Sequence, residues 1–407
     1  MKIATVDTFL VGTPPPFKGG INWGFVKLRT DDGVVGWGEL NGVAFREKTL
    51  VQLVREYADN FLIGVQDPFE IERLWARLYG GDDTGFWAYF RNSGTLGNQV
   101  LAAIEMACWD IIGKVAGQPV HKLLGGRYHE RLRSYSYLYG WRSGDAPEKA
   151  GEAALAVLER GFTAIKFDPI FPLFPAPRSV SLAELRYTDA VLKSIRDAVG
   201  TRMDILIGTH GQLNTHGAIR FAKMMEPYDP LWFEEPVPLE NKVEMGRVAR
   251  STTIPVATGE RLTTKWEFQQ VLENQAAQII QVNVGLSGIL ESRKIAGMAE
   301  AHYAQIAPWM YCGPVSGAAS IQVSACSPNF LIQEGIEDWG GFSAEILKEG
   351  ICWEDGYIIP SDKPGLGIEP DEKVLEKHPP HDMSDERIRA ALRGHFEPVG
   401  PAIAKYA

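Results

Sequence analysis

From about residue 131 onward, the chain repeats one pattern eight times: a short apolar run is followed by a stretch with helical periodicity. Short buried strands that alternate with helices are typical of a parallel sheet, and eight such units in succession favour a closed barrel over a doubly wound sheet. The candidate strands lie near 134–139, 164–167, 205–207, 231–233, 255–257, 279–282, 305–307 and 330–332. The predicted fold class is therefore α/β, with a (β/α)8-type TIM barrel.

The residues before this repeat follow a different pattern. Residues 21–40 contain two β-rich runs joined by Thr30-Asp31-Asp32-Gly33, and Asp-Gly between such runs is a strong hairpin signal. Helical periodicity then dominates from about 49 to 116. This combination predicts an N-terminal α+β capping domain.

The length of the chain accommodates both parts. A barrel of this type takes about 250 residues, so the 407 residues leave room for a second, smaller unit. We predict the capping domain at 1–125, the barrel at 126–363, and a C-terminal segment at 364–407 that packs back on the cap. An apolar, proline-rich stretch at 171–177 is a substrate-covering loop, an oligomer contact, or an irregular loop packed on its own barrel.

Charge and composition argue against several classes of partner. Acidic residues outnumber basic ones by 51 to 41, and no run of Lys or Arg suggests a phosphate-binding face, so we expect no nucleic-acid partner. The N-terminus lacks the apolar stretch of a signal peptide and no later segment could span a bilayer, so we expect a cytoplasmic protein with no membrane partner. Cys108, Cys312, Cys326 and Cys352 show no C-x-x-C spacing, and we expect reduced thiols in or near the core.

Functional side chains of such a barrel lie where its strands end, because the loops at that face carry the active site. The side chains that end or follow the candidate strands are Lys166, Asp168, His210, Glu234, Glu260, Arg261, Asn283, Trp309 and Glu334. Glu234 and Glu260 end consecutive strands, so their carboxylates can point into one space. Two buried carboxylates repel each other unless a cation or a proton intervenes. We therefore predict a metal site, with Mg²⁺ ahead of Ca²⁺ or Mn²⁺, over the alternative of surface or ion-paired carboxylates.

Three further strand-end residues suit acid and base chemistry. Lys166 ends an otherwise apolar run, and it is either solvent-exposed or a base whose pKa burial and a nearby cation would lower. Asp168 lies on the same strand face and is open to three interpretations: a metal ligand, a base, or a partner of Lys166. His210 is either structural or an acid/base group.

These residues resemble the mandelate racemase subgroup of the enolase superfamily, and the similarity extends over nearly the whole chain. The motifs that carry it are Trp23-Gly24-Phe25-Val26-Lys27-Leu28, Gly36-Trp37-Gly38-Glu39, Ala103-Ile104-Glu105-Met106-Ala107-Cys108-Trp109-Asp110, Gly161-Phe162-Thr163-Ala164-Ile165-Lys166, Trp232-Phe233-Glu234-Glu235-Pro236 and Thr258-Gly259-Glu260. Each motif alone is modest evidence, but their order and spacing together are specific.

The resemblance implies that Glu234 and Glu260 bind Mg²⁺, and that the metal and Lys166 hold a substrate carboxylate while a base removes the α-proton. The ene-diolate that forms would then lose its β-hydroxyl with His210 as the acid, which gives a 2-keto-3-deoxy acid. The implied function is a sugar-acid dehydratase for an aldonate or an aldarate. A homo-oligomer is also implied.

The chain departs from the family pattern at three positions. Gly208 stands where the family usually has a metal-binding Asp, and Asn283 and Trp309 stand where it usually has an Asp-His base. We therefore expect Asp168 to take over as third metal ligand or base, beside Lys166 and His210. Trp309, Asn283, Glu334 and Arg261 are predicted to bind substrate. The alternatives are a racemase, epimerase or lactone cycloisomerase, and a non-catalytic sugar-acid binder.

Overall fold

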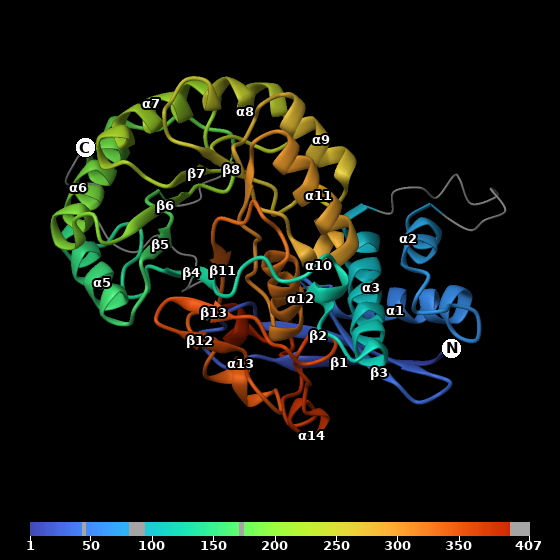
Figure 1. Ribbon diagram of the computed structural model, residues 1–407. Coiled ribbons are helices and arrows are strands. Elements are labelled where there is room, and N and C mark those ends of the chain that lie inside the picture. The colour runs from blue at the N-terminus through green and yellow to red at the C-terminus, as the bar shows by residue number, and fades with distance from the viewer. Residues whose placement is uncertain (43–45, 81–93, 171–174, 391–407) are drawn as a thin grey trace.

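The computed structural model describes residues 1–42, 46–80, 94–170 and 175–390, and it places a three-stranded cap beside a barrel (Figure 1). The cap sheet is antiparallel in the order β1 (Ile3–Gly12), β2 (Asn22–Thr30) and β3 (Val35–Leu40). Gly33 adopts a φ of +89° between β2 and β3, which confirms the predicted hairpin and explains the glycine in its turn.

Helices of the cap pack on or beside this sheet. They are α1 (Glu47–Tyr57), the π-helical η1 (Ala58–Leu62), α2 (Ile71–Gly80), α3 (Gly94–Ala116) and the short α4 (Val120–Leu123). Among them, α3 packs against β2 and β3. The backbone of β3 lies against α3 at Gly36 and Gly38, where a Cβ would collide with the carbonyl oxygens of Ala107 and Ala103. The alternate glycines of β3 therefore permit the long, largely buried helix to pack on the sheet.

The predicted barrel is confirmed. Its parallel strands are β4 (Leu132–Tyr137), β5 (Ala164–Phe167), β6 (Asp204–Gly208), β7 (Trp232–Glu234), β8 (Val256–Thr258), β9 (Ile279–Ile280), β10 (Gln305–Ile306) and β11 (Gln333–Glu334). Each strand pairs with the next from β4 to β10, β11 pairs with β4, and a bridge from Ile306 to Phe330 closes the ring. The last strand begins later than predicted, because at 330–332 only Phe330 forms a bridge and regular pairing with β4 starts at Gln333.

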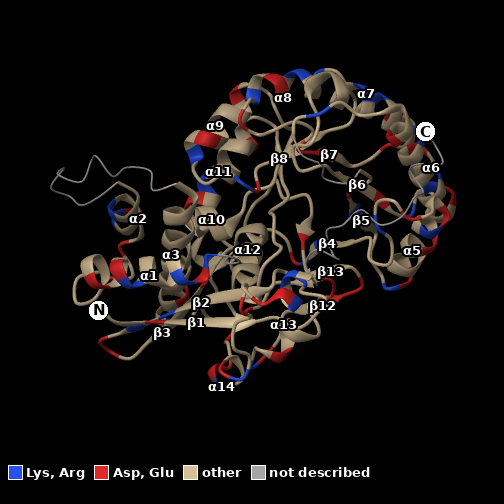
Figure 2. Ribbon diagram, turned by 180° about the vertical axis from the view of Figure 1, so that it is seen from behind, with Lys and Arg blue, Asp and Glu red and all other residues tan. Residues whose placement is uncertain are grey.

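Helices form the outer ring of the barrel (Figure 1). They are α5 (Pro147–Glu159), α6 (Leu182–Val199), α7 (Thr215–Met225), the 3₁₀ turn η3 (Glu226–Tyr228), α8 (Lys242–Ala249), α9 (Lys265–Glu273), α10 (Val284–Ser287), α11 (Ile289–Ala301) and α12 (Pro314–Ala325). Capping boxes begin α6 at Ser181 and α9 at Thr264. Basic and acidic residues are interspersed along these helices (Figure 2).

Two layers of side chains fill the barrel. The lower layer is an apolar cluster with one residue from each strand or its immediate extension: Tyr135, Ala164, Leu206, Trp232, Ala257, Ile279, Ala307 and Ile332. The upper layer lies two residues further along each strand, on the same face. Its members are Tyr137, Lys166, Gly208, Glu234, Gly259, Gln281, Trp309 and Glu334. The upper layer lies at the carboxyl ends of the strands, where TIM barrels carry their active sites.

The chain after β11 contacts both the barrel and the cap. It contains α13 (Phe342–Glu345), β12 (Cys352–Glu354) and β13 (Tyr357–Ile359), and then, within the predicted C-terminal segment at 364–407, α14 (Glu372–Leu375). Strand β13 pairs antiparallel with β4. The ammonium of Lys27 in β2 lies 2.7 Å from Glu372, and the backbone N–H of His381 donates to Asn22. The domain boundaries at 125/126 and 363/364 stay predictions.

Two buried cap carboxylates hold the cap on the barrel. Glu39 at the end of β3 accepts backbone hydrogen bonds from Gly313, Val315 and Ser316 at the start of α12. Glu105 on α3 accepts from the first residues of α11. Burial raises the pKa of each carboxyl to about 7, against the opposing effect of the backbone N–H groups. Each carboxylate satisfies N–H groups that a helix start leaves without partners.

All four cysteines are free thiols, as expected. Cys108, Cys312 and Cys326 are buried. Cys352 is exposed on the β12–β13 hairpin, so its expected place in or near the core was wrong. No helix within the described residues combines the length and the apolar character that a membrane crossing requires. Within the predicted stretch at 171–177, residues 171–174 lie outside the described residues, and its role stays a prediction.

Candidate active site at the carboxyl ends of the barrel strands

Lys166 stands at the centre of the upper layer, with its side chain only 2% exposed. Its ammonium donates to Glu234 Oε1 at 2.6 Å and lies 3.8 Å from Glu334 Oε1. Burial acts to lower the pKa of Lys166, but the carboxylates of Glu234, Glu334 and Glu260 outweigh it and raise that pKa well above its ordinary value. The solvent-exposed alternative for Lys166 is therefore wrong. The other alternative, a base whose pKa a nearby cation lowers, concerns the protein with a cation bound and stays a prediction.

The second oxygen of Glu234 is also held. It accepts from Trp232 Nε1 at 3.1 Å and from Gln281 Nε2 at 2.6 Å. The amide oxygen of Gln281 is buried and has no hydrogen-bond partner. Sequence reasoning missed both partners, although the period of two along each strand places Trp232 and Gln281 inside the barrel.

Glu260 follows β8 and is the least satisfied acid at this face. Its Oε2 is buried without a hydrogen-bond partner. Burial, together with the nearby Glu235 and Glu234, raises its pKa to about 8. A buried charge without a partner is costly unless a proton or a cation neutralises it.

Asp168 fills the space that Gly208 leaves open. A Cβ at residue 208 would collide with Oδ1 of Asp168. The other oxygen of Asp168 accepts from His210 Nδ1 at 2.7 Å. A carboxylate from the end of β5 therefore occupies the position next to β6 where the family pattern leads us to expect an aspartate side chain.

His210 forms an acid/base pair with Asp168. The imidazole side chain is 47% exposed, and the carboxylate of Asp168 raises the pKa of His210 to about 10. His210, two residues after β6, has a φ of 49°, and Glu235, directly after β7, has a φ of 40°, so both adopt the left-handed region. Such backbone strain is rare outside glycine and collects at functional sites, and no sequence pattern signalled it.

The four predicted substrate-binding residues differ in their surroundings. Arg261 is half-exposed and donates to Glu235 at 2.5 Å. Glu334 is fully buried and accepts from Tyr137 Oη and from the backbone N–H of Met310. Asn283 is buried and its amide has two protein partners, Asn41 and the carbonyl of Glu260. Trp309 is partly exposed and pairs with Asn283 through its backbone.

The donor set of this face suits a divalent cation only in part. Within the described residues, no three His, Cys, Asp or Glu side chains are arranged together as a preformed metal site. Glu234 is neutralised by Lys166, and Asp168 by His210. The partnerless, buried oxygen of Glu260, beside Glu234, is the feature that fits a hard cation.

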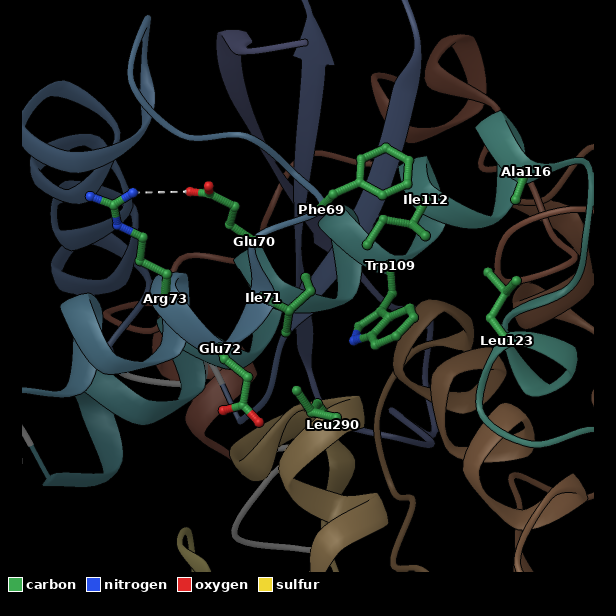
Figure 3. Close-up of a pocket in the computed structure, with 10 residues that line it drawn as sticks. All are labelled: Phe69, Glu70, Ile71, Glu72, Arg73, Trp109, Ile112, Ala116, Leu123 and Leu290. Atoms are coloured by element: carbon green, nitrogen blue, oxygen red, sulfur yellow. Dashed lines mark hydrogen bonds and ion pairs between the residues drawn. The ribbon is translucent and has the colours of Figure 1, made fainter.

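A hollow of about 720 Å³ lies between α2, α3, α4 and α11 (Figure 3). Apolar side chains such as Phe69, Trp109, Ile112 and Leu290 form most of its wall. Its charged residues include Arg73 and Glu70, which pair with each other at 3.4 Å. No side chain from a barrel strand end lines it, so this hollow is separate from the chemistry described above.

Comparisons with known proteins agree with this arrangement. Residues 149–374 match the enolase C-terminal domain-like model, and residues 21–125 match the mandelate racemase/muconate lactonizing enzyme N-terminal domain. A D-galactonate dehydratase of Ralstonia nicotianae is 36% identical over 92% of this chain and 94% of its own length. Solved structures assigned to the mandelate racemase/muconate lactonizing enzyme group, from Labrenzia alexandrii and Burkholderia, are each 48% identical, with TM-scores of 0.89 and 0.90. They cover 94% and 95% of this chain, and 98% and 96% of their own chains.

Proposed function

This chain belongs to the mandelate racemase/muconate lactonizing enzyme family of the enolase superfamily, and from that premise we propose that it is a Mg²⁺-dependent dehydratase of a sugar acid. The observation that carries the proposal is the group of titratable side chains at the carboxyl ends of the barrel strands. It combines a buried lysine, two buried glutamates at consecutive strand ends, and a histidine–aspartate pair at one mouth. The D-galactonate dehydratase relative makes aldonates the first substrates to test and aldarates the second.

We assign the metal to Glu234 and Glu260, with Asp168 as the third ligand. A bound Mg²⁺ would stabilise the negative charge that proton loss draws onto the substrate's carboxylate. The partnerless oxygen of Glu260 supports this assignment, as does the carboxylate of Asp168 over Gly208. Glu234 would then exchange its contact with Lys166 for the cation, which frees the lysine to face substrate.

The proton transfers use groups at the same mouth. Lys166, released from Glu234 and with its pKa lowered by the bound cation, would accept the α-proton. In the alternative arrangement, Asp168 is the base rather than a metal ligand, and Lys166 stays protonated and holds the substrate carboxylate. His210, which the adjacent Asp168 keeps protonated, gives its proton to the departing β-hydroxyl, which leaves as water. The enol that remains rearranges to a 2-keto-3-deoxy acid.

A substrate screen tests this proposal. The protein with Mg²⁺ is incubated with D-galactonate and a panel of other aldonates and aldarates, and 2-keto-3-deoxy product is measured. We expect one acid to turn over and chelation of the metal to abolish the reaction. A protein that binds Mg²⁺ but dehydrates none of these acids would contradict it.

A non-catalytic sugar-acid binder is the second candidate, because Gly208, Asn283 and Trp309 replace the groups that the family pattern leads us to expect. Calorimetric binding of a sugar acid without exchange of its α-proton for solvent deuterium would support the binder. Exchange without dehydration would instead indicate a racemase or an epimerase. The homo-oligomeric state also stays a prediction, which light scattering after size exclusion would check.

A further inference from the structure

The end of β3 reaches the barrel through two residues on one strand face. Glu39 holds the start of α12, as described above. Two residues further on, the buried side chain of Asn41 reaches the segment that follows β9. The cap therefore contacts two neighbouring loops at the barrel mouth from one short stretch of chain.

The contact of Asn41 continues to a candidate metal ligand. Asn41 Nδ2 donates to Asn283 Oδ1 at 2.9 Å, and Asn283 Nδ2 donates to the backbone carbonyl of Glu260 at 3.1 Å. Because a carbonyl can only accept, the amide of Asn283 has one possible orientation, and its oxygen must face Asn41. Asn41 is therefore the donor that completes the pair.

The adjacent backbone is shaped to admit Asn41. A Cβ on Gly285, in α10, would lie 2.9 Å from both Cβ and Nδ2 of Asn41 and 3.2 Å from Asn283 Oδ1. Any larger residue at 285 would push the two asparagines apart. Because Gly285 has no side chain, it leaves room for the Asn41–Asn283 hydrogen bond, although glycine lowers the helix propensity of α10.

We propose that Asn41 and Asn283 are positioning residues through which the cap sets the main chain of Glu260, and so the aim of its partnerless carboxylate oxygen. This inference rests on the proposed function, because it requires Glu260 to bind the cation. It gives Asn283 a role other than substrate binding, because the oxygen and the nitrogen of its side-chain amide are both hydrogen-bonded to protein. It also makes the Asn41–Asn283 contact and cation affinity thermodynamically linked, so that each strengthens the other.

The test uses substitutions of similar size without a change in charge. In Asn41→Leu and Asn283→Leu, one side of the hydrogen-bonded pair is lost. In Gly285→Ala, both asparagines remain but are displaced. The affinity of the full chain for Mg²⁺ is measured by calorimetry at a temperature where each variant is folded. We expect a loss of about 10-fold to 100-fold, the scale seen when groups that orient metal ligands are removed.

Two controls separate positioning from general damage. Asn60→Leu changes an exposed asparagine in η1 of the cap and should leave the affinity unchanged. Glu105→Gln weakens cap docking at the start of α11, away from the Asn41–Asn283 contact, and should lower the melting temperature but keep the Mg²⁺ affinity within about 3-fold of the unaltered chain, well below the positioning effect.

The outcomes are distinct. If the unaltered chain binds Mg²⁺ and folded Asn41→Leu binds it equally well, the positioning role is wrong and the proposed function stands. An equal loss in Glu105→Gln would also overturn it, since docking in general would then set the affinity. If Asn41→Leu does not fold, Gly285→Ala decides. If the unaltered chain binds no Mg²⁺, the proposed function fails, and the positioning role fails with it.

Discussion

The lower and upper layers of the barrel lie on the same strands, two residues apart, yet they differ in what holds them together. The lower layer is packed from apolar side chains and is almost fully buried. The upper layer is equally enclosed at Lys166, Glu234, Gln281 and Glu334, but it is held by ion pairs and hydrogen bonds and leaves the buried amide oxygen of Gln281 without a partner. The lower layer therefore provides rigidity. The upper layer carries the energetic cost of buried polar groups without full hydrogen bonding, which a bound ligand can relieve.

Among substitutions in the two layers, Lys166→Met in the upper layer should reduce activity the most. Loss of the central cation should lower kcat/KM by about 10,000-fold, the upper end of what a proton-transferring side chain contributes. Steady-state kinetics with the substrate found by screening would check this. A loss below about 100-fold would show that Lys166 is structural.

His210→Asn should lower kcat by about 100-fold to 1,000-fold through loss of the acid. Asp168→Asn provides a sharper measurement. Since Asp168 raises the pKa of His210 to about 10, its removal should return that pKa toward the ordinary 6.5. NMR titration of the imidazole would detect this change, and an unchanged pKa would contradict the pair.

Asp168 and Gly208 should be exchangeable only together. Gly208→Asp alone places a side chain where Asp168 Oδ1 lies, and we expect it to destabilise the fold by about 1–3 kcal/mol through overpacking. Adding Asp168→Gly should restore the stability and keep a carboxylate in the same space. Thermal unfolding and Mg²⁺ calorimetry on the two single variants and the double variant form a double-mutant cycle. If the changes in stability of the single variants simply add in the double variant, Asp168 and Gly208 do not share one space.

Alkaline pH should destabilise the metal-free protein through Glu260. The folded pKa of Glu260 is about 8, above the ordinary 4.5, so its contribution is complete below about pH 4.5 and is lost as pH rises through 8. Glu260→Gln should remove this loss, which is on the order of a few kcal/mol at most. Chemical unfolding at pH 5 and pH 9 would measure it. Added Mg²⁺ should reduce the loss in the unaltered chain but not in the variant.

Ile279→Val in the lower layer should have the smallest effect on function. Deleting one buried methylene group should cost about 0.5–1.5 kcal/mol of stability, while kcat/KM per folded molecule stays within about 2-fold, because no charge near the substrate changes. Denaturant unfolding and kinetics on the same preparation would show this. A large loss of activity would mean that the two layers are not independent.

The sequence alone determined the barrel and the residues that end its strands. Apolar periodicity is a local property, so the alternation of strand and helix was readable without contacts, and so were the places of Lys166, His210, Glu234 and Glu260. The three departures from the family pattern were equally visible, because each is a single residue at a known strand end.

Only the tertiary structure decided what surrounds those residues. The pKa direction of Lys166 depends on Glu234 and Glu334 from distant strands, and the place of Asp168 depends on the space above Gly208. Asn41 meets Asn283 across 242 residues of chain. Charge interactions and hydrogen bonds act through space between segments that local patterns treat separately. The strand ends could therefore be predicted, whereas their partners could not.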